Sequence, residues 1–300
     1  MRATLITLIG PQISSDLTDA ISTGLQALAG AGGEVTNSRP PHAENLAQLT
    51  VRQWSVEVAV GVVREAFSSL IPAAQRAGAD LLITPSEFLA PGPRLIVTDV
   101  DSTLIQDEVI ELLAQHAGTR AEVARVTEAA MRGELDFSQS LIERVATLRG
   151  VPENVYKAVF AALRLSPGVE NLCRVLKGQG DFIGVVSGGF IEIVAPLAEK
   201  LEIDFARANA LEIANGTLTG RVTGEIVDKR VKARTLRQWA QETGVGLERT
   251  IAVGDGANDL DMLAAAGLGV AYNAKPVVQQ QADTAIAGPR LDALLAVIGN

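Results

Sequence analysis

The chain has 300 residues, 47% of them apolar, which is enough for a sizeable core and for one large or two ordinary domains. Its formal net charge of −9 argues against a nucleic-acid partner, because phosphate backbones are bound through basic surfaces. Cys173 is the only cysteine, so an intrachain disulfide or a metal site built from several thiolates is not possible in this sequence. This fits a reducing compartment.

Membrane and export signals are not visible in the sequence. No segment offers the roughly 20 apolar residues that a membrane helix needs. The apolar run near the start, "MRATLITLIG", is too short for a secretory signal. We therefore expect a soluble, cytoplasmic protein.

The first third of the chain predicts a small α+β domain over residues 1–88. A strand is expected over 3–9, followed by a helix whose apolar stripe is Leu17, Ile21, Leu25 and Leu28. Strand-like segments follow at 46–51 and 55–60, then a helix over 63–76 and a strand over 80–84. This order is βαββαβ. The stretch "TPSEFLAPGPR" at 84–94 is rich in proline and predicts a linker.

After the linker, strands and helices alternate, which predicts a doubly wound, mostly parallel sheet over residues 89–300. Strands are expected at 95–100, 182–186, 204–208, 250–254 and 268–272, with helices at 190–200, 229–243 and 257–266. Residues 106–165 carry several helical runs in succession, which predicts a helical insertion after the first strand. Asn215-Gly216 predicts a hairpin turn.

The carboxyl ends of these strands carry the chemical groups. In open parallel sheets, ligands bind beyond those ends, so we expect the following side chains to gather at one edge: Asp99 and Asp101, Ser187 with Gly188 and Gly189, Asp255, Asn258, Asp259 and the helical Lys232. Two carboxylates one residue apart repel unless a cation neutralises them or one is protonated. Oxygen ligands of this kind favour Mg²⁺.

This group suits phosphoryl transfer. A carboxylate kept ionised by a metal can attack phosphorus, and aspartyl phosphates are an established type of covalent intermediate. A second carboxylate can protonate the leaving oxygen and later take a proton from water. Ser187, the neighbouring backbone N–H groups and Lys232 would hold the phosphoryl oxygens.

The motifs resemble, in order, those of the haloacid dehalogenase superfamily: "DVDSTL", "VSGG", Lys232 and "GDGAND". The resemblance is greater to its phosphoserine phosphatases and extends through "DEVIELLA", "EAAMRGELDFSQSLIERV" and "GEIVDKRVKA", covering about 95–300. It implies an Mg²⁺-dependent phosphatase that hydrolyses O-phospho-L-serine in the last step of serine biosynthesis. The N-terminal part is similar to ACT domains, although their usual Asp-x-Pro-Gly turn is absent.

The resemblance also implies roles for individual residues. Asp99 would be the nucleophile and Asp101 the acid and base, with Mg²⁺ held by Asp99, the Asp101 carbonyl and Asp255. Ser187, Lys232 and Asn258 would hold phosphate, and Gly188 would let the backbone approach the ligand. Asp259 would orient Lys232 or a metal-bound water. In the insertion, Glu108 would take the serine ammonium and Arg144 its carboxylate, under an apolar lid of Met131 and Phe137.

Other interpretations remain open at this point. A phosphatase of the same mechanism could act on another small phosphomonoester, although a sugar phosphate would give neither Glu108 nor Arg144 a partner. A phosphomutase could use the same aspartate pair. In a different class, the chain could be an amino-acid-sensing binding module. A homodimer is a further expectation for the N-terminal domain.

Overall fold

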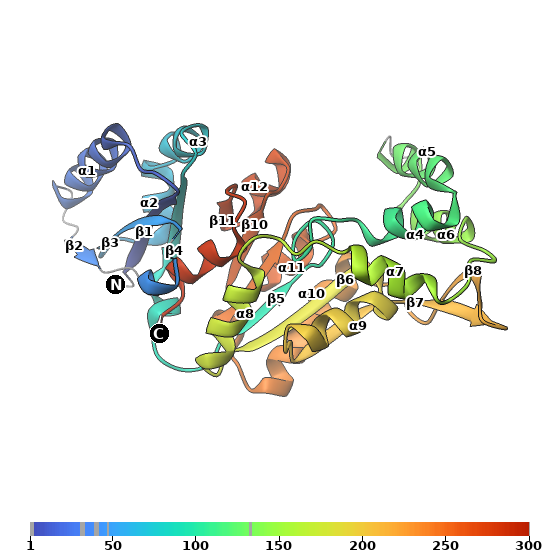
Figure 1. The fold of residues 1–300 in the computed structure, drawn as a ribbon. Coiled ribbons are helices and arrows are strands. Elements are labelled where there is room, and N and C mark those ends of the chain that lie inside the picture. Colours follow the sequence, from blue (N-terminus) through green and yellow to red (C-terminus); the bar gives the residue numbers. More distant parts are fainter. Residues whose placement is uncertain (1–2, 31–33, 39–41, 47, 132–133, 300) are drawn as a thin grey trace.

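The computed structural model describes residues 3–30, 34–38, 42–46, 48–131 and 134–299, which form two β-sheets (Figure 1). A four-stranded sheet has the order β2-β3-β1-β4, and a seven-stranded sheet has the order β11-β10-β9-β5-β6-β7-β8. No helix among the described residues is long and apolar enough to cross a membrane.

The smaller sheet is antiparallel and follows the predicted βαββαβ order. Its elements are β1 (Thr4–Gly10), α1 (Ser15–Gly30), β2 (Val35–Ser38), the 3₁₀ turn η1 (Ala43–Leu46), β3 (Thr50–Val56), α2 (Val60–Ala66), α3 (Leu70–Arg76) and β4 (Asp80–Pro85). Leu17, Ile21, Leu25 and Leu28 are all buried, so the predicted stripe of α1 is its inner face.

Three predictions in this part were wrong in position. The second and third strands in chain order lie at 35–38 and 50–56 rather than at 46–51 and 55–60. The sequence of β2 is mostly polar because this strand is at the sheet edge, so it shows little hydrophobic alternation. The helix predicted over 63–76 is two helices, because the ring of Pro72 would collide with the carbonyl of Ser68 in a continuous helix.

The larger sheet confirms the predicted doubly wound architecture. Its strands are β5 (Leu95–Thr98), β6 (Phe182–Phe190), β7 (Phe205–Ala214), β8 (Thr217–Thr223), β9 (Thr250–Gly254), β10 (Leu268–Tyr272) and β11 (Thr284–Ile286). All pairs are parallel except β7–β8, which form a hairpin around Asn215 and Gly216, both with positive φ. Alternate residues of β5 enter different cores, Ile96 on one face and Val97 on the other.

Helices cover both faces of this sheet and extend beyond one end of it (Figure 1). Around the sheet lie α8 (Val169–Gly178), α9 (Ile191–Lys200), α10 (Lys229–Thr243), α11 (Leu260–Ala265) and α12 (Pro276–Gln281), with short 3₁₀ turns η2 (Ser86–Leu89) and η3 (Leu247–Arg249). Between β5 and α8 lie α4 (Val109–Ala117), α5 (Arg120–Met131), α6 (Phe137–Ala146) and α7 (Val155–Ala162). The chain enters and leaves these four helices at adjacent points, where Ile105 and Leu165 form an isolated bridge.

The C-terminal 3₁₀ segment η4 (Leu291–Val297) joins the two sheets. Every residue of it is buried. The amide of Gln53 on β3 donates to the carbonyl of Ala296 at 2.9 Å, and Asp80 accepts hydrogen bonds from the backbone N–H groups of Ala287 and Gly288. The smaller sheet is therefore fixed at the end of the core opposite to α4, α5 and α6 (Figure 1).

Candidate active site

The central strand β5 delivers the first carboxylate into a buried position. Asp99 follows β5 directly and is only 3% exposed. Its backbone N–H donates to Val253 on β9, and its Oδ1 accepts the N–H of Val100 at 2.7 Å. Burial, together with the negative charge of Asp259, raises the pKa of Asp99 well above its ordinary value. The ammonium of Lys232 opposes this shift of the Asp99 pKa and favours the ionised form.

Asp101 lies two residues further, half-buried beside Ser187. Its Oδ1 accepts the N–H of Val109 at 2.8 Å, and its Oδ2 accepts the Ser187 hydroxyl at 3.2 Å. Desolvation and the negative charge of Glu108 raise the pKa of Asp101 to about 7. A carboxyl group with such a pKa can both donate and accept a proton near neutral pH.

Lys232 supplies a buried positive charge between two of the carboxylates. Its Nζ lies 2.8 Å from Asp99 Oδ1 and 2.7 Å from Asp259 Oδ1, and all three side chains are at most 5% exposed. Burial disfavours the ammonium form, but the two carboxylates outweigh this and raise the pKa of Lys232. The side chain of Asp228 caps the N-terminus of α10 by accepting the N–H of Val231. This cap fixes the first turn that carries Lys232.

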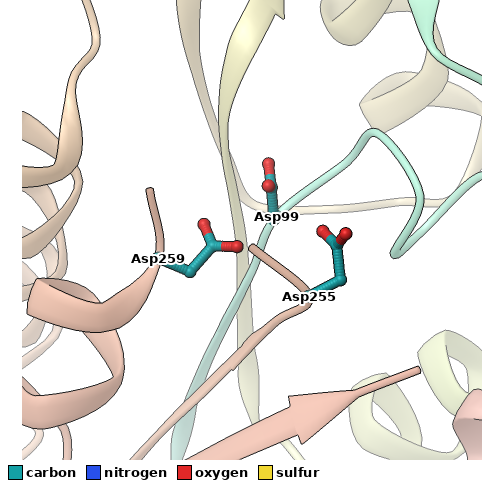
Figure 2. A group of neighbouring side chains, drawn as sticks. All are labelled: Asp99, Asp255 and Asp259. Carbon is teal, nitrogen blue, oxygen red and sulfur yellow. The ribbon is translucent and has the colours of Figure 1, made fainter. Parts of the chain in front are cut away.

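Asp99, Asp255 and Asp259 form a cluster of acidic oxygens, all within 4.8 Å of one another. Figure 2 shows the three carboxylates converging, Asp99 from the end of β5 and the others from the segment after β9. Desolvation and Asp259 raise the pKa of Asp255 to about 6. Asp99 and Asp259 both contact Lys232, and Asp259 also accepts the N–H of Gly256, whereas Asp255 accepts a hydrogen bond from the Thr103 hydroxyl. This all-oxygen set fits a hard cation such as Mg²⁺.

The turn after Val186 requires glycine for reasons of space. A Cβ on Gly189 would lie 2.7 Å from Asp101 Oδ2, and one on Gly188 would lie 2.9 Å from the ring of Phe137. The N–H of Gly189 donates to Ser187 Oγ at 2.8 Å. The amide nitrogen of Asn258 lies 3.4 Å from Asp99 Oδ2.

A cavity of about 190 Å³ connects these groups to the helical insertion. Its lining includes Glu108, Phe137 and Arg144 from the insertion. Glu108 accepts the Ser102 hydroxyl at 2.7 Å, and burial lowers the pKa of Arg144 although Glu108 opposes that shift. The cavity is thus lined by one negative and one positive side chain from the insertion and by the aspartates that follow β5 and β9.

The structure brings together all the candidate residues whose side chains it describes. The predicted lid residue Met131 ends α5, and its side chain lies outside the described part. Sequence reasoning did not identify Ile110, Leu141 and Phe190, which also line the cavity. It also missed Thr103, whose hydroxyl donates to Asp255 at 3.2 Å. The position of Thr103 in "DVDSTL" was the signal that could have indicated such a contact.

Comparison with known proteins identifies the family of this chain. Residues 96–264 match the family of haloacid dehalogenase-like hydrolases. A phosphoserine phosphatase of Streptomyces coelicolor is 50% identical over 98% of this chain and 70% of its own length. The phosphoserine phosphatase SerB2 of Mycobacterium tuberculosis is 56% identical over 69% of this chain, but only 50% of its own length is matched. The chain belongs to the phosphoserine phosphatases of the haloacid dehalogenase-like hydrolase family.

Solved structures of the family extend the similarity to three dimensions. A probable phosphoserine phosphatase from Vibrio cholerae, unliganded, has a TM-score of 0.74 and 34% identity, covering 98% of this chain and 86% of its own. A substrate-bound phosphoserine phosphatase complex has a TM-score of 0.66 and 39% identity. It covers 70% of this chain and 100% of its own.

Proposed function

We propose that the enzyme hydrolyses O-phospho-L-serine to L-serine and phosphate through a phosphoryl group carried on Asp99. The single observation that carries the proposal is one cavity that is lined both by Asp99 and Asp101 and by the opposite charges of Glu108 and Arg144. The phosphate of phosphoserine would face the aspartates. Its ammonium and carboxylate would face the two charged side chains of the insertion.

In the first step, a carboxylate oxygen of Asp99 attacks phosphorus while the bond to the serine oxygen breaks. Asp101 gives its proton to that oxygen, so serine leaves as a neutral hydroxyl. In the second step, Asp101 takes a proton from water as the water oxygen attacks the same phosphorus. The bond to Asp99 then breaks and phosphate leaves. A pKa of about 7 lets Asp101 serve in both directions.

Charge at the phosphoryl oxygens would be matched by Lys232, Ser187 and the N–H groups of the glycine turn. Asn258 would help to position the phosphate. We propose that Mg²⁺ is held by Asp99, Asp255 and the carbonyl of Asp101, where it would neutralise part of the carboxylate charge. Asp259 would orient Lys232, to which it is bonded at 2.7 Å.

Recognition of the serine part would rest on charge pairing in a confined space. Arg144 suits a carboxylate because its planar fork can bind both oxygens, and Glu108 suits an ammonium group. Phe137 and Met131 would cover the ligand on the insertion side and limit the access of water. The product is the free amino acid, so the enzyme would complete serine biosynthesis.

The N-terminal part would be an ACT-like domain of residues 1–88. The βαββαβ order and the antiparallel sheet support this assignment. We propose that it contributes to stability and to dimer formation rather than to the chemistry, because none of its described residues is among those that line the active-site cavity.

The experiment is phosphate release from three esters that differ by one group each: L-phosphoserine, phosphoethanolamine, which lacks the carboxylate, and 3-phosphooxypropanoate, which lacks the ammonium. Each is measured with Mg²⁺ and with chelator. Metal-dependent turnover that is fastest on L-phosphoserine supports the proposal. Equal rates on all three esters would support the phosphatase reaction but refute phosphoserine as the specific substrate. Steady turnover of any of them would exclude a protein that only binds amino acids.

Two variants test the charged pair separately. Arg144→Ala should raise KM for phosphoserine roughly 10-fold or more and leave phosphoethanolamine almost unchanged, because only phosphoserine has a carboxylate to lose. Glu108→Gln should raise KM for phosphoserine and leave KM for 3-phosphooxypropanoate almost unchanged, because only phosphoserine has an ammonium group. Arg125→Ala, at an exposed position of α5, is the matched control and should change neither ratio.

A further inference from the structure

The strand pairing breaks at the glycine turn of the active site. Val186 of β6 pairs with Arg207 of β7, and the next pair is Phe190 with Asn209. Residues 187–189 therefore lie opposite the single residue 208. A bulge of this size leaves backbone groups without their ladder partners, and buried backbone groups need another partner.

Asn209 provides that partner with its side chain. The residue is 1% exposed, and both ends of its amide are used. Its Nδ2 donates to the carbonyl of Gly188 at 2.8 Å, and its Oδ1 accepts the N–H of Val227 at 2.8 Å. Because the N–H of Val227 can only donate, the oxygen of the amide must face Val227. The orientation of the side chain is therefore fixed.

The bond to Gly188 orients one peptide plane. The carbonyl of Gly188 and the N–H of Gly189 belong to the same planar unit and point in opposite directions. On the far side of that unit, the N–H of Gly189 donates to Ser187 Oγ at 2.8 Å, and this hydroxyl donates to Asp101 Oδ2 at 3.2 Å. Asn209 thus lies at the start of a chain of hydrogen bonds that ends on the carboxyl group of Asp101.

The bond from Asn209 to Val227 connects the glycine turn to the start of α10. Val227 immediately precedes Asp228, the N-cap of α10, and Lys232 lies on the first turn of that helix. The same amide therefore ties the Ser187 turn to the segment that carries Lys232. These two segments are more than 30 residues apart in sequence, and β7 lies between them along the chain.

We propose that Asn209 is a positioning residue that sets the distance and orientation between the Ser187–Gly189 turn and Lys232, and so shapes the site for the phosphoryl group. This inference rests on the proposed function, in which Ser187 and Lys232 hold the phosphoryl oxygens. Asn209 is not among the residues that line the active-site cavity, so it would act through its neighbours. Its effect is expected on any phosphate ester, independent of the groups that recognise serine.

The test uses Asn209→Leu, which keeps the branched shape and removes both bonds, and Asn209→Ala, which leaves room for water. Each variant is assayed with p-nitrophenyl phosphate and with phosphoserine, and for inhibition by orthovanadate, which mimics the phosphoryl group in transfer. Asn171→Ala is the matched control. Asn171 donates to Asn45 and Asp292 at the junction of the two sheets, away from the active site.

We expect kcat/KM to fall about 10²-fold for both esters in Asn209→Leu, because a misplacement of about 1 Å affects a reaction this strongly. The inhibition constant for orthovanadate should rise in parallel. Asn171→Ala should lower the thermal midpoint without changing orthovanadate inhibition. In a Ser187→Ala background, Asn209→Ala should cost much less than in the wild type, because part of its effect passes through Ser187.

Two outcomes would overturn the inference. Folded Asn209 variants with kcat/KM and orthovanadate inhibition within twofold of the wild type would show that the turn keeps its shape without the amide. Lower thermal stability or insolubility with unchanged orthovanadate inhibition of the soluble fraction would assign a structural role only. A wild type that hydrolyses neither ester would instead refute the proposed function, so the two failures are distinguishable.

Discussion

Replacing Lys232 by methionine tests the electrostatic basis of the site. Methionine keeps most of the length of the side chain and removes the charge. Two buried ion pairs are lost, 2.8 Å to Asp99 and 2.7 Å to Asp259, and two carboxylates remain together without a cation. Removing one partner of a buried pair costs about 3–5 kcal/mol in the free energy of unfolding. For a chain of this size, we expect the thermal midpoint to fall by roughly 10 °C.

The same substitution should also reduce activity. Losing one preorganised donor to a developing oxyanion typically lowers kcat about 10²–10³-fold. Thermal unfolding is measured in chelator at pH 7.5, so that added metal does not compensate, and kcat is measured with Mg²⁺. The matched control is Lys229→Met, three residues earlier on α10. That side chain is 55% exposed and lies 4.0 Å from Asp261, so its removal should cost less than about 1 kcal/mol.

A double variant separates charge imbalance from simple loss of packing. Lys232→Met with Asp259→Asn removes one of the two carboxylates that Lys232 contacts, so the thermal midpoint should recover part of the loss seen in Lys232→Met alone. Kinetic activity should stay low, because the cation is still absent. A midpoint for Lys232→Met within 2 °C of the wild type, or additive effects in the double variant, would refute the argument, since the ion pairs would then contribute about 0 kcal/mol.

The remaining predictions concern the nucleophile, pH and the N-terminal part. Asp99→Asn should lower phosphate release roughly 10³-fold or more while the circular dichroism spectrum stays unchanged, and appreciable residual turnover would move the nucleophile elsewhere. In chelator, the thermal midpoint should fall as pH rises. The pKa values of Asp255 and Asp101 are raised from 3.8 to about 6 and about 7, so their stabilising contribution is complete below pH 3.8 and is lost as pH passes through those two values. Mg²⁺ should restore the midpoint most above pH 7, and a stabilisation independent of pH would contradict this. A chain without residues 1–85 should keep kcat/KM for phosphoserine within about tenfold but unfold at lower temperature, because η4 loses its cover and exposes apolar surface. A folded but inactive fragment would show that the smaller sheet is part of the active unit.

The sequence was most informative where a feature is local. Strands of the parallel sheet are buried on both faces, so β5, β9 and β10 appear as short apolar runs that end in polar residues. The chain order of those runs is sufficient to predict that Asp99 and Asp255 lie at the same edge of the sheet. The predicted spans of α10 and β9 coincide with the observed ones.

Local patterns failed where long-range packing decides the structure. Strand β2 is at the edge of its sheet and pairs with one neighbouring strand only. Its sequence shows little hydrophobic alternation, so the predicted position of this strand was wrong. Asn209 carries no recognisable signal either. Its role depends on partners at Gly188 and Val227, which only the fold brings within hydrogen-bond distance.

The sequence by itself determined the class of fold, the family and the set of carboxylates, because these depend on short motifs at the ends of apolar runs. Only the tertiary structure decided that Lys232, rather than the neighbouring Lys229, is buried between Asp99 and Asp259. It also decided how the smaller sheet is attached through η4. Burial and pairing of charges are properties of the assembled core. The two lysines lie three residues apart on α10, and the packing of that helix against the core decides which of them is buried and paired with carboxylates.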